Sequence, residues 1–119
     1  MRAPEPVILL PEIDSFERRP DGLNLQFVVP ADLGYFAGHF PGVPLLPGVV
    51  QIGWAVELAR QHVPFDAQFR ALAGVKFMRV IQPGATVALQ LAFDAAAREL
   101  SFEYRCGGQP CSGGRALFQ

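Results

Sequence analysis

The sequence predicts an α+β fold in which one buried helix combines with an antiparallel sheet of about six strands. The first observation is an apolar helical pattern that starts at Pro47 or Gly48 and ends near His62. The second is a set of short segments typical of β-strands, separated by turn residues. Two of these segments precede the helix and four follow it: 7–16, 23–29, 69–81, 86–93, 100–106 and 111–118.

The length of 119 residues predicts one domain, covering residues 1–119, with a modest core. Half of the residues are hydrophobic and 18% are charged, which indicates a globular protein and excludes a disordered one. A net charge of −1 gives no electrostatic reason to expect nucleic acid or a membrane surface as a partner. The sequence has no long apolar run and no signal-peptide pattern, so we expect a cytoplasmic protein.

The two strands before the helix are expected to form a hairpin. In 23–29, apolar residues alternate with Asn24 and Gln26, which is the period of a half-buried strand. The Arg-Pro-Asp-Gly segment 19–22 supplies the turn, and Pro30 ends the second strand.

The helix is expected to begin at Pro47 or Gly48, because a proline in the first turn has no N–H to leave unpaired. It carries a single acidic residue, Glu57. Apolar residues on nearly all sides predict burial of the helix. They are Val49, Val50, Ile52, Trp54, Ala55, Val56, Leu58 and Ala59.

The four later segments are joined by short connections, 82–85, 94–99 and 107–110, as in an antiparallel meander. Cys106 and Cys111 flank the last connection, where a disulfide between facing strands is geometrically feasible. In a cytoplasmic protein we expect both thiols to be reduced, and their spacing does not indicate a metal site.

The segment 38–50 holds one histidine, three prolines and three glycines. Prolines restrict the path of the chain and glycines allow tight turns, so His39 sits in a rigid frame suited to holding an imidazole against a substrate. The pKa of histidine is normally near neutrality, which makes His39 a candidate general base. The alternative is a buried histidine that serves only the structure.

Residues 38–48 resemble the active-site motif of the β-hydroxyacyl-ACP dehydratases, G-H-F-P-G-x-P-x-x-P-G, at every fixed position. Residues 77–84 resemble a second segment of that family, and the resemblance extends over 35–84. The continuation 51–54 resembles a dehydratase-like branch of aryl-polyene-type pathways. The resemblance implies the hotdog fold, a central helix wrapped by an antiparallel sheet, and a dimer as the usual unit.

The implied activity is 3-hydroxyacyl-ACP dehydration, which yields a trans-2-enoyl thioester in fatty-acid or polyene/polyketide synthesis. The substrate would be carried on the phosphopantetheine of an acyl carrier protein, and neither a cofactor nor a metal is implied. In a homodimer, His39 of one chain would lie near the helix of the other. By the same resemblance, the N–H of Gly48 would bind the thioester oxygen; the alternative is that Gly48 only eases the turn into the helix.

The acid of the reaction is where the chain departs from the family. The dehydratases carry Asp or Glu on the helix 14 residues after the histidine, and this chain has Gly53 there. Glu57 lies one turn further on about the same helical face and is our candidate acid. Gln51 is a neutral alternative that could hold a water molecule, and we expect it beside Gly48 among the substrate-binding residues. A third reading is that His39 works alone.

Two further alternatives remain open. The chain could be a non-catalytic partner of an active paralogue, a reading that Gly53 supports, or a hotdog thioesterase, against which the histidine motif argues. Glu57 could instead form an ordinary ion pair with Arg60 or Arg79. Lys76 and Arg79 are candidate contacts for the acidic carrier protein; the alternative is that they are solvated charges at a strand edge.

Overall fold

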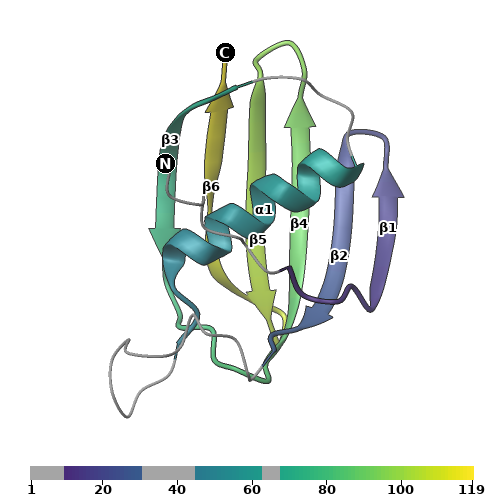
Figure 1. Ribbon diagram of the computed structural model, residues 1–119, viewed down its shortest axis with the longest axis vertical. Coiled ribbons are helices and arrows are strands. Elements are labelled where there is room, and N and C mark those ends of the chain that lie inside the picture. The colour runs from purple at the N-terminus through teal and green to yellow at the C-terminus, as the bar shows by residue number, and fades with distance from the viewer. Residues whose placement is uncertain (1–9, 31–44, 63–67) are drawn as a thin grey trace, which may run out of the picture.

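In the computed structural model, one helix crosses one face of a six-stranded antiparallel sheet (Figure 1). The structure describes residues 10–30, 45–62 and 68–119. The predicted α+β class is confirmed. The elements are β1 (Ser15–Arg19), β2 (Gly22–Val28), α1 (Gly48–His62), β3 (Phe69–Phe77), β4 (Thr86–Asp94), β5 (Glu99–Cys106) and β6 (Gln109–Phe118).

The strand order is β1-β2-β4-β5-β6-β3, so β1 and β3 form the two edges. Strands β5 and β6 form a tight hairpin through Gly107 and Gly108, whose φ values of 57° and 78° favour glycine. Strand β3 follows the helix in sequence and pairs with β6, not with β4. Its outer edge, which pairs with no other described strand, therefore lies at the end of the sheet where α1 begins (Figure 1).

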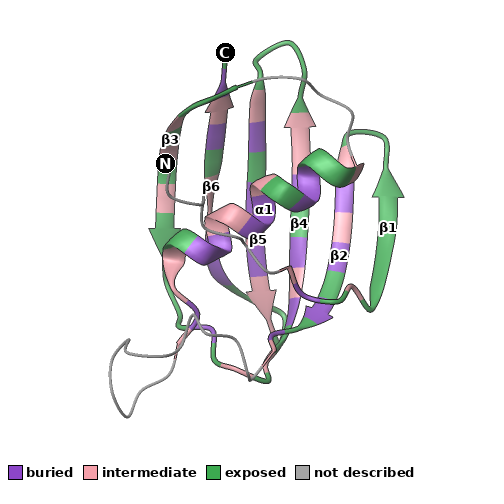
Figure 2. Ribbon diagram, in the orientation of Figure 1, coloured by how far each residue is buried: buried purple, intermediate pink, exposed green. Residues whose placement is uncertain are grey.

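The core lies between α1 and the sheet. Side chains of β2, β4 and β5 alternate between buried and solvent-facing, which Figure 2 shows as bands along each strand. The indole of Trp54 is fully buried and meets the Phe27 ring edge-on, with 5.7 Å between ring centroids. Asn24, Gln26 and Gln90 point to the opposite face, which is polar.

The helix is buried only on the side that faces the sheet. On the other side, Val49 is 77% exposed and Glu57 is exposed as well. The predicted burial on nearly all sides is therefore not met in the single chain, because one sheet covers only one face of a helix.

Both predicted ends of the helix are confirmed, at Gly48 and His62. At the C-terminal end, the Arg18 guanidinium donates to the carbonyl of His62 at 3.1 Å, and the Phe16 ring lies 5.4 Å from the imidazole. A cation is favourable there because the last carbonyls of a helix carry partial negative charge. Strand β1 thereby holds the end of α1 to the sheet.

The prediction for the first strand was wrong in its bounds. Residues 10–14 are not a strand, and β1 instead occupies Ser15–Arg19 with every side chain exposed. The apolar residues that indicated a strand, such as Leu10 and Ile13, pack against the core from an irregular segment. The turn at 20–21 was predicted correctly, and it sets the register that pairs Arg19 with Gly22. Residues 7–9 lie outside the described ranges.

Strand β3 is shorter than predicted, ending at Phe77. The N–H groups of Met78 and Arg79 both donate to the carbonyl of Cys111, at 2.8 and 3.0 Å, and this shared acceptor ends the ladder. Earlier in β3, a bulge at Gly74, where φ is +61°, shifts the register of pairing with β6 between Ala73 and Lys76.

Cys106 and Cys111 are free thiols near each other. Burial and a hydrogen bond with Cys111 raise the pKa of Cys106 to about 12. In the described part of the chain, no helix has both the length and the apolar character needed to cross a membrane. The organisation as one domain over residues 1–119 stays a prediction.

Candidate functional site at the start of the helix

The first turn of α1 presents backbone donors. The N–H groups of Val50 and Gln51 both donate to the carbonyl of Pro47 at 3.1 Å. Among the described residues, no hydrogen bond uses the N–H of Gly48 or Val49. Unpaired N–H groups at the positive end of a helix favour a negatively charged oxygen.

A hollow of about 370 Å³ lies next to this turn. Its lining comes from two segments that are distant in sequence, 45–48 with Gln51 and the segment 77–80, which begins with the last residue of β3. The lining side chains are mostly apolar, and Arg79 is the one that carries a charge. An apolar hollow with a few polar groups at one end has the composition expected of a small-molecule site.

Gly48 and Phe77 are in close contact inside this hollow. A Cβ atom added to Gly48 would lie 2.5 Å from Cζ of Phe77, far closer than two carbons can approach. The Phe77 ring is 53% exposed and so occupies the open part of the hollow. A side chain at position 48 would therefore fit only if the Phe77 ring moved aside.

Backbone hydrogen bonds hold the two walls together. The N–H of Leu46 donates to the carbonyl of Ile81 at 2.7 Å, which joins the helix entry to the segment after β3. The bonds from Met78 and Arg79 to Cys111 join that segment to β6. Cys111 is an extra residue in β6, since Tyr104 pairs with Ser112 and Arg105 with Pro110. This bulge turns its carbonyl toward the hollow's outer wall.

Gln51 lines the hollow but is only 3% exposed. Its Nε2 donates to the carbonyl of Leu46 at 3.0 Å, and its Oε1 accepts from the Ser112 hydroxyl at 2.6 Å. The Tyr104 hydroxyl donates to the Gln51 carbonyl at 2.7 Å. The amide is thus already engaged within the protein, while its second N–H bond is still available in principle. A contact of Gln51 with substrate or water stays a prediction.

Glu57 does not reach this hollow in the single chain. It lies nine positions after Gly48 on the helix, a rise of about 13 Å, and its side chain is exposed. No ion pair within the described residues includes Glu57. The Arg60 guanidinium lies 5.8 Å from the centre of the Phe118 ring. The role of Glu57 as the acid stays a prediction, as does that of His39, which lies outside the described residues.

The two candidate carrier-protein residues lie along the edge of the sheet. Lys76 is exposed on β3, and Arg79 is exposed beside the hollow. The structure therefore brings together Gly48, Gln51 and Arg79, with Lys76 at the end of the adjacent strand.

Sequence reasoning did not assign a role to Phe77, Tyr104 or Ser112. The segment that contains Phe77 was recognised by its resemblance, but nothing in it predicts contact with Gly48. Ser112 is 61 residues away from Gln51 along the chain, so no local pattern could reveal their hydrogen bond.

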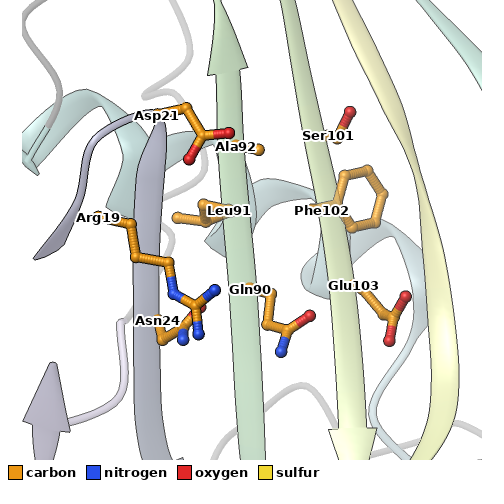
Figure 3. Close-up of a pocket in the computed structure, with 9 residues that line it drawn as sticks. All are labelled: Arg19, Asp21, Asn24, Gln90, Leu91, Ala92, Ser101, Phe102 and Glu103. Carbon is orange, nitrogen blue, oxygen red and sulfur yellow. The ribbon is translucent and has the colours of Figure 1, made fainter. Parts of the chain in front are cut away.

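A second hollow, of about 290 Å³, lies on the opposite face of the sheet (Figure 3). Polar side chains from four strands or their turns line it, among them Arg19, Asn24, Gln90 and Glu103. It presents neither a helix terminus nor any of the predicted site residues. Within residues 10–30, 45–62 and 68–119, His, Cys, Asp and Glu side chains form no group of three that could hold a metal ion.

The helix on an open antiparallel sheet, with a hollow where the helix begins, is the architecture of a hotdog protein. The sequence matches the ApeI-like family, described as ApeI dehydratase, over residues 15–115. This match covers most of the chain and both walls of the hollow, so the chain belongs to the ApeI-like dehydratase family.

Two solved structures are similar over nearly their whole length. The dehydratase heterocomplex ApeI:P from Xenorhabdus doucetiae aligns with a TM-score of 0.85 and 32% identity, covering 91% of this chain and 96% of that one. An uncharacterized protein from Erwinia carotovora subsp. atroseptica aligns with a TM-score of 0.83 and 31% identity, covering 93% and 97%. The predicted hotdog fold is confirmed.

Among curated proteins, the 3-hydroxyacyl-[acyl-carrier-protein] dehydratase FabZ of Chloroflexus aggregans is 35% identical over 78 residues. The alignment covers 60% of this chain and 54% of that protein. The chain spans about half the length of the curated relatives it matches. The predicted resemblance to the β-hydroxyacyl-ACP dehydratases is confirmed.

Proposed function

We propose that the chain is a 3-hydroxyacyl-ACP dehydratase, which converts a 3-hydroxyacyl thioester into a trans-2-enoyl thioester and water. The observation that carries the proposal is the apolar hollow at the start of α1, formed by the two segments that resemble the dehydratases. The reaction removes a proton from C2 and a hydroxyl from C3, with no net oxidation, so it needs no redox cofactor.

In the proposed mechanism, His39 removes the C2 proton as the general base. Negative charge then develops on the thioester oxygen, and the N–H of Gly48 donates to that oxygen at the positive end of α1. An acid protonates the departing C3 hydroxyl, which leaves as water. The apolar lining of the hollow strengthens these interactions by excluding solvent.

Two groups are candidates for the acid that protonates the departing hydroxyl. Glu57 is exposed on the side of α1 that faces away from its own sheet. A side chain in that position suits a site completed by a second chain. Alternatively, His39 returns its own proton to the hydroxyl on the same face of the substrate.

We propose that the functional unit is a homodimer formed around the β3 edge and the exposed side of α1. Large apolar side chains gather there, with Val49, Phe77, Met78 and Val80 each more than half exposed. A free strand edge beside such residues is normally covered. Since the hollow lies among them, a second chain would also close it from solvent.

The proposed substrate is an acyl chain on the phosphopantetheine of an acyl carrier protein, in fatty-acid or aryl-polyene-type synthesis. Lys76 and Arg79 provide positive charge beside the hollow for this acidic partner. A cytoplasmic location stays a prediction.

A second candidate function is that of a non-catalytic subunit paired with an active paralogue. Gly53 at the usual acid position favours it, and the similar structure from Xenorhabdus doucetiae is described as a dehydratase heterocomplex. A thioesterase is not favoured by any relative described above.

The test is to incubate the purified chain alone with 3-hydroxyacyl-ACP and to measure loss of water by mass spectrometry of the phosphopantetheine arm. The dehydratase proposal expects the enoyl product with the chain alone. Two results together would support the non-catalytic subunit instead. The product would form only when a paralogous dehydratase is added, and it would form equally well when this chain carries His39→Ala. Release of free acid would indicate a thioesterase.

A further inference from the structure

Two buried hydroxyl groups converge on Gln51 beneath the hollow. Gln51 and Ser112 are the two polar residues of the described chain that are buried, and the Tyr104 side chain is fully buried beside them. Ser112 donates to the Gln51 amide oxygen, and Tyr104 donates to the Gln51 carbonyl. Buried polar groups cost stability unless they are paired, and each polar atom of this cluster has a hydrogen-bond partner.

The cluster acts on Leu46, which lies two residues before the helix begins. Gln51 Nε2 donates to the carbonyl of Leu46, while the N–H of Leu46 donates to Ile81. Both polar groups of Leu46 are thereby fixed between the helix and the opposite wall. Only Pro47, whose ring restricts φ, stands between Leu46 and Gly48. The position of Leu46, together with the helix bonds that the Pro47 carbonyl accepts, therefore restricts where the Gly48 N–H points.

The Leu46 carbonyl sets which way the Gln51 amide faces, and Ser112 holds the other end of that amide. A glutamine amide has a donor end and an acceptor end, and only one orientation places N–H against Leu46. The carbonyl of Leu46 can only accept, so it selects that orientation, and the hydroxyl of Ser112 donates to Oε1 at 2.6 Å and fixes the amide in place. Burial raises the pKa of Tyr104 above its usual range, so its hydroxyl stays a neutral donor to the first turn of α1.

The same stretch of β6 holds both walls of the hollow. The carbonyl of Cys111 accepts the N–H groups of Met78 and Arg79 on one wall. The side chain of the next residue, Ser112, holds Gln51 on the other. The bulge at Cys111 makes this possible, because it places two successive residues toward the hollow and the core.

We propose that Ser112 and Gln51 are positioning residues, which hold Leu46 and thereby aim the Gly48 N–H at the thioester oxygen. This inference rests on the proposed dehydratase function for its kinetic consequence, although the positioning itself does not require catalysis. Neither residue needs to touch the substrate.

The kinetic test compares Ser112→Ala with Ser101→Ala, a matched control at an exposed serine on the outer face of β5. A misaimed donor affects the transition state more than substrate binding, so we expect Ser112→Ala to lower kcat by about tenfold and to change KM by less than about twofold. Gln51→Met, which keeps the size but lacks the amide, should have the same effect. The double variant should be no worse than the more affected single one.

A second measurement does not depend on activity. Backbone amide shifts and hydrogen exchange of Leu46 and Gly48, followed by NMR, should change in Ser112→Ala and in Gln51→Met but not in Ser101→Ala. If one variant fails to fold, the other still gives the answer.

A merely structural role predicts a different pattern, namely a lower unfolding temperature with unchanged kcat and unchanged Gly48 amide signals. That pattern would overturn the inference. If the wild-type chain has no dehydratase activity, the proposed function fails while the NMR comparison still decides whether Ser112 positions Gly48. Unchanged Leu46 and Gly48 signals in both variants would refute the positioning on their own.

Discussion

Replacing Gly48 with alanine tests the proposed oxygen-binding site most directly. The added methyl carbon would lie 2.5 Å from Cζ of Phe77 and 2.9 and 3.0 Å from the two Cε atoms. Ordinary carbon contacts are about 3.5–4.0 Å, so the ring has to retreat by about 1 Å. Phe77 is 53% exposed and can rotate toward solvent, which keeps the energetic cost low.

The expected effect on stability is therefore small. An off-rotamer aromatic ring costs about 0.5–1.5 kcal/mol of folding free energy. Alanine offsets part of this cost, because it stabilises a helix by up to about 1 kcal/mol relative to glycine. The unfolding temperature should change by no more than about 8 °C, at roughly 4–8 °C per kcal/mol for a small domain. Circular dichroism during heating measures this change.

The expected effect on activity is large. A methyl group beside the Gly48 N–H and a displaced Phe77 ring both enter the space that the thioester would occupy. A misplacement of about 1 Å can cost about 10² in rate, so kcat/KM with a 3-hydroxyacyl thioester should fall about a hundredfold in Gly48→Ala. Initial rates of enoyl formation at low substrate concentration measure this ratio.

The double variant Gly48→Ala/Phe77→Ala separates the two causes. Recovery of activity in the double variant, relative to Gly48→Ala, would assign the loss to the displaced ring. No recovery would assign it to the methyl group at the N–H. A wild-type value of kcat/KM in Gly48→Ala would refute the proposed oxygen-binding site. It would mean that catalysis does not need a substrate oxygen close to the N–H of residue 48.

Four further outcomes are expected. His39→Ala should lower the dehydration rate by about 10²–10⁴, as loss of a general base does, with an unchanged circular dichroism spectrum; wild-type turnover would remove His39 from the mechanism. Glu57→Gln should lower the chemical step by at least about tenfold if Glu57 is the acid, and full activity in single-turnover assays would leave His39 working alone. Sedimentation at micromolar concentration should find a dimer, whereas a monomer would count against a site shared between chains. Lys76→Glu should weaken binding of acyl-ACP and reduce its salt dependence, while the rate with a small thioester stays the same; unchanged ACP affinity would mean that Lys76 is only an edge charge.

Much of the fold is determined locally, and the sequence was sufficient for it. The helix limits follow from Pro47 and from the apolar spacing after it, and α1 indeed covers Gly48–His62. The turn at 20–21 and the Gly107–Gly108 hairpin follow from residues that favour those backbone conformations. Residues close together in the chain decide such features, so a pattern can predict them.

The site could be predicted only in part for the same reason. The motif around Gly48 and the segment 77–80 were each recognisable, and the structure places them on either side of one hollow. His39 was assigned from the motif alone. Gln51 was expected at the substrate, but its amide is held by Leu46 and Ser112, and the partner on β6 has no sequence signal near Gln51.

Tertiary structure alone decided which segments meet. Strand β3 pairs with β6 instead of its sequence neighbour β4, and this brings Phe77 over Gly48. The first strand was misplaced because Leu10 and Ile13 pack against the core from an irregular segment and are not part of the sheet. Burial of the helix on nearly all sides was expected, yet one sheet buries only one side of α1 and leaves Glu57 exposed. Contacts of this kind depend on how the completed sheet and helix pack together, and periodicity along the chain carries no information about them.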